Sequence, residues 1–309
     1  MMRLKQNVLL APYTTFGIGG RARYFISATN PAELVSAVRL AKKNHWRYFI
    51  IAGGSNVVFG DKTFDGLVIR FLPSPSGRVE RGQGSTLTCP ANLSLECLIK
   101  TAISNGLAGL ETLSGIPGTV GGAIVGNAGA YGQTISDCLV KVEIFDGRKI
   151  KWLTKKQCRF TYRDSIFKHR GWIILRAEFK LVKGVKKDLA KKSQEIIKIR
   201  IEKYDPKLRC PGSFFKNVLV EDISSQTKKL IDQTKIRDDK IPAGYLLEAV
   251  GAKGMRVGGI YVAGWHGNLL INDGHGTYHD VKTLVAKLKR LVKNKFGITL
   301  DEEVRYMIA

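Results

Sequence analysis

Cysteine is scarce in this sequence and shows none of the spacings that disulfide or metal frameworks use. The 309 residues contain five cysteines, an odd number, and no two of them form a C-x-x-C pair. This usage fits a reducing cytoplasm, and no ligand spacing typical of a zinc site is present. We therefore expect a cytoplasmic chain with no structural disulfide and no bound metal.

Long apolar runs are also missing. The opening residues, MMRLKQNVLLAPY, lack the extended apolar stretch of a signal peptide. No run approaches the ~20 apolar residues that a membrane-spanning helix requires. The sequence therefore predicts a protein that does not contact a membrane.

Acidic residues are few, because 26 Asp and Glu stand against 50 Lys and Arg, a formal charge of +24. Such an excess fits an anionic partner such as nucleic acid or a phosphorylated ligand. Much of the lysine, however, falls in 183–203 and 282–295, where the apolar spacing predicts amphipathic helices with lysine facing solvent. Nucleic-acid binding would also need aromatic residues interleaved with the basic ones. A solvated basic surface is the favoured interpretation, and nucleic-acid binding is the weaker one.

Glycine, in contrast, is plentiful and clustered, as in loops where backbone approaches a ligand. An apolar strand at 48–52 runs into Gly53, Gly54, Ser55 and Asn56, whose backbone N–H groups could form a nest for phosphate oxygens. The alternative is an ordinary tight turn. The motif is neither a Walker loop nor a G-x-G-x-x-G fingerprint, so a Rossmann domain is disfavoured.

A longer glycine-rich stretch, SGIPGTVGGAIVGNAGAYG at 114–132, is more specific. It is apolar yet dense in glycine, which is poor for a helix and unusual for a surface loop. Bare backbone of this kind would let a planar ring and a diphosphate lie close to the chain. We favour a cofactor role over a purely structural one.

The remaining pattern predicts an α+β protein with mixed sheets rather than one doubly wound sheet. A helix should begin at Asn30-Pro31, because Asn caps and Pro suits the first turn, and a hairpin should turn at Asp146-Gly147. Further helices are expected near 94–105, 185–203, 243–250 and from Thr277 through Leu291. Further strands are expected at 66–71, 256–272 and 303–308, and a strand at 172–181 is expected to close its unit.

Six segments, in order along the chain, resemble the UDP-N-acetylenolpyruvoylglucosamine reductase family and span nearly the whole sequence. They are TFGIGG at 15–20, AGGSNVV at 52–58, IPGTVG at 116–121, CRFTYRDS at 158–165, GSFFKN at 212–217 and LDEEVR at 300–305. The resemblance implies a vanillyl-alcohol-oxidase (PCMH-type) FAD fold followed by an α+β substrate domain. The implied divisions are FAD subdomains at 1–73 and 74–184 and a substrate domain at 185–309, with the strand at 303–308 returning toward the active site.

The resemblance also implies the reaction. NADPH would reduce FAD, and the flavin would reduce the enolpyruvyl ether of a UDP-sugar to the lactyl ether of UDP-N-acetylmuramate, in peptidoglycan synthesis. The partners would be the UDP-sugar and NADPH, and the protein would be a monomer. Residues 204–211 form a short connection without the inserted tyrosine-bearing loop of one family branch, which implies the loop-less branch. Cys210 in this connection is interpreted as structural.

Three catalytic residues follow from the same resemblance. Hydride addition from flavin N5 to the terminal enolpyruvyl carbon builds negative charge beside the carboxylate, and Arg163 would stabilise it through two parallel N–H groups. Ser213 would donate a proton to the adjacent carbon. Glu303 would stabilise the intermediate or orient that proton network. Glu302 would point the other way if the segment is a strand.

The resemblance also implies residues that bind the cofactor and the substrate. The residues expected to contact FAD are Gly53, Gly54, Ser55, Asn56, Ile116, Pro117, Gly118, Thr119, Gly121, Gly122, Asn127 and Gly129. The residues expected to contact substrate are Tyr162, Lys203, Asn217 and His266. Another FAD-dependent oxidoreductase on the same fold is the principal alternative, because a fold does not fix a function. A flavin colour would separate both flavoprotein interpretations from nucleic-acid binding.

Overall fold

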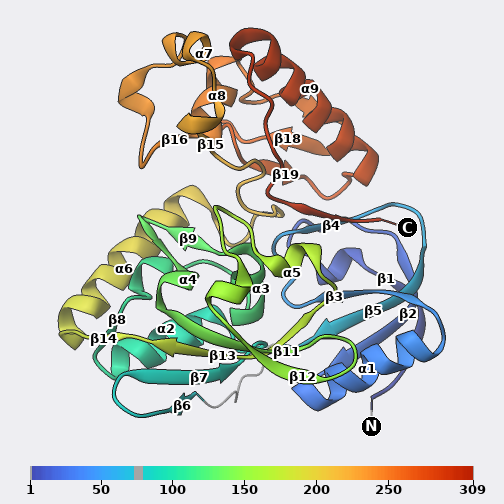
Figure 1. Cartoon of the computed structure of the whole chain (residues 1–309). Helices are drawn as coiled ribbons and strands as arrows, with labels where there is room; N and C mark the ends of the chain where they lie inside the picture. Colours follow the sequence, from blue (N-terminus) through green and yellow to red (C-terminus); the bar gives the residue numbers. More distant parts are fainter. Residues whose placement is uncertain (1, 73–78, 309) are drawn as a thin grey trace. The chain divides into compact units, whose positions relative to one another are not determined.

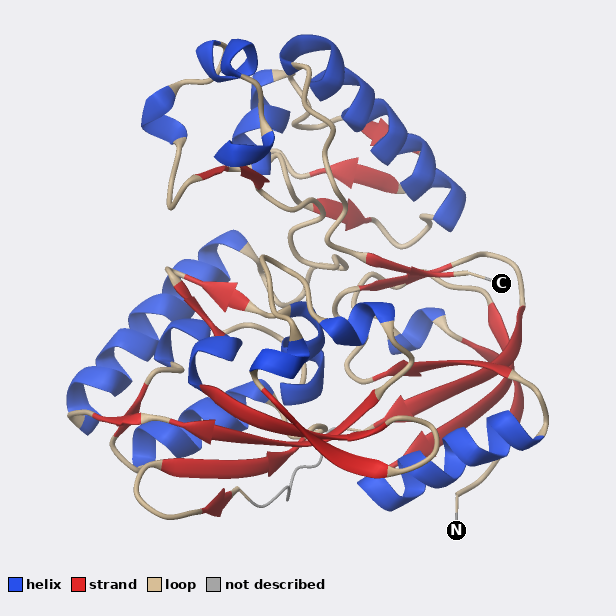
Figure 2. Cartoon of the chain, in the orientation of Figure 1, coloured by secondary structure: helices blue, strands red, loops and turns tan. Residues whose placement is uncertain are grey.

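The computed structural model describes residues 2–72 and 79–308, which fold into two compact units (Figure 1). Unit 1 comprises the described chain up to Gln6 together with Tyr24–Gly53 and Asp65–Asp205. Unit 2 comprises Asn7–Arg23, Gly54–Phe64 and the described chain from Pro206 onward. The expected division between residues 73 and 74 lies outside the described residues. Helices and strands are mixed throughout (Figure 2), which confirms the α+β class.

The N-terminal β-α-β element forms as the sequence predicts. Asn30 accepts a hydrogen bond from the Glu33 N–H at 3.0 Å and so caps helix α1 (Pro31–Lys43), which begins with proline. The strands of its sheet, in spatial order, are β1 (Lys5–Leu9), β2 (Arg21–Ala28), β5 (Phe64–Phe71) and β3 (Arg47–Ile51). Strand β3 pairs in parallel with β5, and the first glycine-rich loop follows its carboxyl end.

A five-stranded antiparallel sheet forms the second layer of unit 1. Its strands, in spatial order, are β12 (Ile150–Thr154), β11 (Leu139–Phe145), β13 (Ile173–Lys180), β7 (Thr86–Pro90) and β6 (Glu80–Arg81). The predicted β11–β12 hairpin is confirmed, and Asp146 accepts hydrogen bonds from the N–H groups of Arg148 and Lys149 in its turn. Strand β13 was expected to close the unit but lies centrally, because β11 and β7 pair with it on either side.

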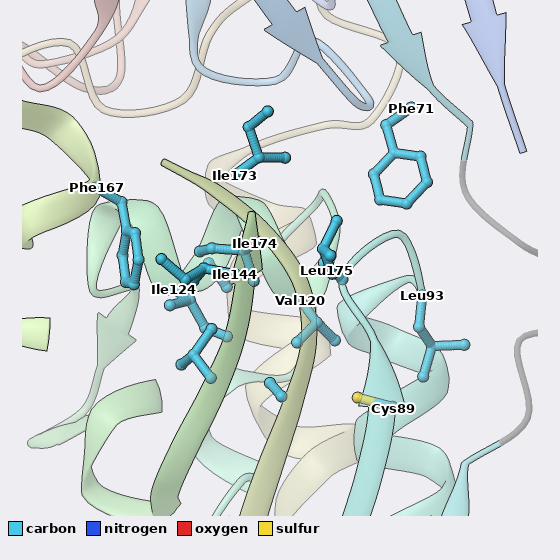
Figure 3. Packing of buried hydrophobic residues seen from close by; sticks show 14 of the residues in the cluster. Phe71, Cys89, Leu93, Val120, Ile124, Ile144, Phe167, Ile173, Ile174 and Leu175 are labelled. Carbon is cyan, nitrogen blue, oxygen red and sulfur yellow. The ribbon is translucent and has the colours of Figure 1, made fainter. Parts of the chain in front are cut away.

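The glycine-rich stretch contains a helix that the sequence did not predict, α3 (Val120–Gly126). Thr119 caps it by accepting a hydrogen bond from the Gly122 N–H at 3.3 Å. Val120 and Ile124 are fully buried and lie beside Ile174 of β13 (Figure 3). Burial of this apolar face offsets the low helix propensity of the glycines.

Helix α6 (Lys186–Lys203) has the amphipathic pattern expected, with Leu189, Ser193 and Ile196 on its buried face. It packs against the predicted helix α2 (Leu95–Ser104) within unit 1. The other short elements of unit 1 are β8 (Leu107–Ala108), β9 (Gly129–Ala130), β10 (Gln133–Thr134), α4 (Ile135–Cys138), α5 (Ile166–His169) and β14 (Val182–Lys183).

Unit 2 packs α8 (Ala243–Ala249) and α9 (Tyr278–Phe296) around a separate core that includes Phe16, Phe214 and Phe215. Thr277 and Asp280 form the expected capping box at the start of α9. The strands are β15 (Val218–Leu219), β16 (Lys240–Ile241), β17 (Arg256–Val257), β18 (Ile260–Val262), β19 (Leu270–Asn272), β4 (Val57–Phe59) and β20 (Arg305–Met307), with a short helix α7 (Ser225–Lys229).

The last strand is shorter than the sequence predicts. β20 pairs in parallel with β4 only over Arg305–Met307, so Glu303 precedes the strand instead of lying within it. Among the described residues, no helix is both long and apolar enough to cross a membrane.

Candidate active site

Gly53 and Gly118, one residue from each glycine-rich segment expected to bind a cofactor, approach each other in unit 1. A Cβ atom built on Gly53 would lie 3.9 Å from the Cα of Gly118. Gly118 has a φ of +120°, a conformation that side chains rarely adopt. Neither Gly53 nor Gly118 has a side chain at this contact, so the backbone is open to the close approach of a planar ring or a phosphate group.

Backbone hydrogen bonds hold the second of these segments in place. The carbonyl oxygen of Gly118 accepts from the Leu95 N–H at 3.0 Å, and the Gly121 N–H donates to the Ala91 carbonyl at 2.7 Å. A Cβ atom on Gly121 would come within 3.0 Å of the Ala91 Cβ, so glycine permits this approach. These contacts within the fold hold the loop in place.

Asn127 links this stretch to the predicted catalytic turn and carries an unsatisfied polar atom. Its Nδ2 donates to the Thr161 carbonyl at 2.9 Å, while its buried Oδ1 has no hydrogen-bond partner among the described residues. Buried polar atoms are nearly always paired, so this oxygen favours a bound group with a donor nearby. Gly129 lies where a Cβ atom would come within 2.7 Å of the Gln133 carbonyl, which indicates a role in the β9–β10 hairpin.

Gly54 belongs to unit 2 and is under the strongest steric restriction in its loop. Its φ is +65°, and a Cβ atom there would collide with the carbonyl oxygen of Tyr13. The Gly54 carbonyl also accepts from the Thr15 N–H at 3.1 Å. This hydrogen bond joins the matched segments at 15–20 and 52–58. Gly54 is therefore required for the fold as well as for any phosphate nest.

We expect Gly54→Ala to lose folded protein, while Gly53→Ala should fold. The left-handed conformation alone costs a side chain about 1–2 kcal/mol, to which the collision with Tyr13 adds. Thermal unfolding of both variants measures this difference. Equal melting temperatures would contradict the steric reading of Gly54, and lowered flavin content in a well-folded Gly53→Ala would place Gly53 at the cofactor.

Arg163 lies at the tip of a tight turn in unit 1. Thr161 and Asp164 exchange backbone hydrogen bonds of 3.2 Å, and Arg163 adopts a left-handed φ of 53° between them. Lys168 Nζ donates to the Arg163 carbonyl at 2.6 Å and so fixes the turn. A non-glycine residue held in this strained region is typical of functional sites.

Ser213 and Glu303, ninety residues apart in sequence (303 − 213), are brought together in unit 2. The Glu303 N–H donates to the carbonyl of Phe214 at 2.8 Å, next to Ser213. On the other side, Ser213 forms a β-bridge with Leu269, and the Phe214 N–H donates to the Asn268 carbonyl at 3.0 Å. The segment carrying Ser213 is therefore held between two other segments of the chain.

Asn268 is a positioning residue that the sequence analysis missed. Its side chain accepts from the Phe215 N–H and donates to the Phe215 carbonyl, both at 2.8 Å. The residue is only 3% exposed, so both bonds are shielded from water. An asparagine next to an apolar strand was the available signal. Asn268 fixes the backbone two residues after Ser213.

The adjacent Glu302 and Glu303 make different contacts. Glu302 forms a β-bridge with Phe215, and its carboxylate accepts from Lys289 Nζ at 3.2 Å. Glu302 is thus engaged in a structural ion pair. The Glu303 carbonyl accepts from Asn56 Nδ2 at 3.2 Å, so Asn56, which is expected to contact the cofactor, also supports the backbone of Glu303.

The four residues expected to contact substrate lie in two regions of the chain. In unit 2, Asn217 Oδ1 accepts from the Ala243 N–H at 3.1 Å, and a Cβ atom on Gly244 would lie 2.8 Å from the His266 ring. Asn217 and His266 therefore both lie at the start of α8. In unit 1, Tyr162 packs its ring 5.9 Å from the Arg163 guanidinium, and Lys203 is exposed at the end of α6.

Thiol and metal chemistry have little support here. Burial raises the pKa of the Cys210 thiol, although a hydrogen bond from the Gly212 N–H lowers it in part, so the thiolate is disfavoured. Within 2–72 and 79–308, no group of three or more His, Cys, Asp and Glu side chains could hold a metal ion.

Comparisons with known proteins identify a family for the N-terminal part of the chain and another for the C-terminal part. Residues 22–149 match the FAD binding domain family, and residues 205–307 match the family described as UDP-N-acetylenolpyruvoylglucosamine reductase, C-terminal domain. A protein of that reductase name from Solibacter usitatus is 42% identical over 96% of this chain and 95% of its own length. One from Carboxydothermus hydrogenoformans is 34% identical over 98% of this chain and 93% of its own.

Structural comparison gives the same result. The crystal structure of UDP-N-acetylenolpyruvylglucosamine reductase from Thermus caldophilus is similar to this chain with a TM-score of 0.76 and 29% identity. The similarity covers 99% of both chains.

Proposed function

Since the chain belongs to the UDP-N-acetylenolpyruvoylglucosamine reductase family, we propose that it reduces the enolpyruvyl ether of that UDP-sugar to UDP-N-acetylmuramate for peptidoglycan synthesis. The observation that carries the proposal is 42% identity to a reductase of this name over nearly the full length of both proteins. The chain has an FAD-binding domain, and NADPH is the proposed electron donor.

The residues present fit FAD. The bare backbone at Gly53 and Gly118 and the unpaired Asn127 Oδ1 are features that a ring and a diphosphate can use. We assign FAD binding to the twelve glycine-loop residues named from the sequence, within 1–73 and 74–184, and substrate binding to 185–309. FAD held by these residues would supply the hydride chemistry, from NADPH as proposed donor to the terminal carbon of the enolpyruvyl group.

Three residues of the protein then stabilise the negative charge that develops on the substrate and deliver a proton to it. Arg163 holds the carboxylate, on which negative charge grows as the new C–H bond forms. Ser213 gives its hydroxyl proton to the adjacent carbon, so that one hydride and one proton saturate the double bond. Glu303 orients the Ser213 proton network.

The remaining assignments are part of the same proposal. Tyr162, Lys203, Asn217 and His266 bind the UDP-sugar, and Lys203 suits a diphosphate as a point charge. The connection at 204–211 is short and leaves no room for an inserted tyrosine-bearing loop, which supports assignment to the loop-less branch. We propose that the protein is a cytoplasmic monomer. We also propose that its basic residues form a solvated surface and do not bind nucleic acid.

Steady-state assay tests the function directly. Purified protein supplied with FAD should oxidise NADPH only when the UDP-enolpyruvyl sugar is present, and mass spectrometry should find the product two hydrogens heavier. NADPH oxidation with no reduced sugar product would contradict the proposal. A yellow protein that reduces another acceptor instead would favour a different oxidoreductase of the same fold.

Glu303→Gln should slow turnover by about 100-fold, while Glu302→Gln should leave it near normal. The two residues are adjacent, but only Glu302 is held by Lys289, so the pair of variants separates catalysis from backbone disturbance. Turnover of both variants with saturating NADPH measures the difference. A larger loss in Glu302→Gln would mean that the roles are reversed.

A further inference from the structure

The turn that carries Arg163 is tied to the end of helix α3 on both of its sides. Before Arg163, the Thr161 carbonyl accepts a hydrogen bond from Asn127 Nδ2 at 2.9 Å. After it, the Ser165 hydroxyl donates to the Val125 carbonyl at 2.7 Å. Val125 lies in the last turn of α3, and Asn127 is the C-cap of that helix. Both ends of the turn are therefore fixed to one end of one helix.

Helix α3 is a firm support for the turn, because its apolar face is buried in the core of unit 1. Ile124 is fully buried, and it shares this core with Phe167 of α5, the helix that begins directly after Ser165 (Figure 3). Ser165 itself is only 1% exposed, so its hydrogen bond is shielded from water. The Ser165 hydroxyl thus connects the turn to a part of unit 1 that is closely packed.

The other contacts of the turn come from residues that are close to it in sequence. Lys168 Nζ donates to the Arg163 carbonyl at 2.6 Å, and His169 Nε2 lies 2.8 Å from Asp164 Oδ2. Both side chains belong to α5 and support the shape of the turn. The two bonds to the end of α3 instead span 40 and 34 residues of chain. They therefore fix where the turn lies in unit 1.

Arg163 needs this support because its backbone is strained. Its φ of 53° is in the left-handed region, which residues with side chains adopt only where the surrounding structure imposes it. A turn released from α3 would relax, and the guanidinium group would move with it. Misplacement of a reacting or binding group by about 1 Å can slow a reaction about 100-fold.

We propose that Ser165 is a positioning residue for Arg163. By fixing the turn to α3, it holds the Arg163 guanidinium where that group binds the carboxylate of the enolpyruvyl ether. The inference rests on the proposed function, which assigns the carboxylate to Arg163. Ser165 gives a cleaner test than Asn127, because Asn127 is also assigned to FAD and its loss would disturb both groups.

Equilibrium binding to the FAD-loaded, oxidised protein tests this proposal without turnover. Flavin absorbance is titrated with the UDP-enolpyruvyl sugar and with UDP-N-acetylglucosamine, which lacks the carboxylate. In Ser165→Ala we expect about 10-fold weaker binding of the first ligand, as for one lost hydrogen bond, and unchanged binding of the second. Ser165→Cys, whose thiol is a weaker donor, should give an intermediate loss. Equal weakening of both ligands in Ser165→Ala, or no weakening, would overturn the proposal.

A double-mutant cycle tests whether Ser165 acts through Arg163. With Arg163 intact, Ser165→Ala should slow reoxidation of the flavin by the UDP-enolpyruvyl sugar about 10- to 100-fold and leave its reduction by NADPH near normal. In an Arg163→Lys background the same change should add little, because the guanidinium that Ser165 positions is already absent. Full additivity of the two changes would mean that Ser165 acts independently of Arg163, and it would overturn the proposal.

The matched control is Ser136→Ala, which removes another buried hydroxyl group of unit 1. Ser136 is 5% exposed, and its Oγ lies 3.0 Å from Thr134 Oγ1. This variant should lower the melting temperature but bind both ligands as the parent protein does. If it loses affinity for the UDP-enolpyruvyl sugar as Ser165→Ala does, the effect is one of stability and the proposal is wrong.

Two further outcomes are decided in advance. If Ser165→Ala does not fold, Ser165→Cys carries the test, and binding of both ligands by Ser165→Cys at the parent affinity overturns the proposal. Failure of the parent protein to bind the UDP-enolpyruvyl sugar would instead refute the proposed function.

Discussion

Ser213→Ala should leave the reduction of bound FAD by NADPH near its normal rate and slow its reoxidation by the UDP-enolpyruvyl sugar by about 10²- to 10⁴-fold. Alanine removes only the hydroxyl that we assign as the proton donor. The hydride step from NADPH does not involve that proton, so the two half-reactions should separate. Stopped-flow absorbance of the flavin under anaerobic conditions measures each rate.

The backbone around Ser213 makes this variant a clean test. Four neighbouring hydrogen bonds hold the segment through Phe214 and Phe215, and none of them uses the Ser213 side chain. Ser213→Cys serves as a matched control, since it retains an acidic hydrogen of similar size and should recover part of the lost rate. Equal slowing of both half-reactions in Ser213→Ala would indicate disturbed folding and would remove Ser213 as the donor.

Arg163→Lys should reduce turnover by about 100-fold or more, although it keeps the positive charge. A lysine cannot offer two parallel N–H groups to a carboxylate, and the loss should fall on the reoxidation step, where charge develops. The measurement is again the rate of each half-reaction, combined with the FAD content of the variant.

Arg159→Lys is the matched control for this variant. Arg159 lies in the same matched segment, has a left-handed φ of 49° and is exposed, so the change tests the backbone strain without the catalytic guanidinium. It should retain activity. Normal reoxidation in Arg163→Lys, or equal losses in both variants, would exclude Arg163 from the carboxylate-binding role.

Local hydrogen bonding explains which elements could be predicted from the sequence. The Asn30 cap, the Thr277–Asp280 capping box and the Asp146 turn each depend on residues two or three apart, so their signals are fully visible in the sequence. The central place of β13 depends on β7 and β11, which lie far along the chain. No local pattern encodes that pairing.

For the site, the sequence could name individual residues but could not show which of them lie close together. Motif resemblance named Ser213 and Glu303, but the bond between Glu303 and Phe214 is a tertiary contact that only the structure reveals. Asn268 was missed because it lies in no matched motif. It could have been suspected as a polar residue next to an apolar strand.

Helix α3 was missed for a different reason. Its glycines lower helix propensity, yet Thr119 caps it and Val120 and Ile124 bury its apolar face. Tertiary burial here outweighs local propensity. The same glycines keep the backbone bare where Gly118 approaches Gly53, so one stretch serves both the core and the cofactor loop.

The central claim is that this protein transfers electrons from NADPH through FAD to an enolpyruvyl ether. The most direct test is to reduce the FAD-loaded protein anaerobically with one equivalent of NADPH and then mix it with the UDP-enolpyruvyl sugar. We predict that the flavin absorbance returns in full, with one equivalent of UDP-N-acetylmuramate formed. Protein that binds no flavin after FAD addition, or reduced flavin that only oxygen reoxidises, would contradict the claim.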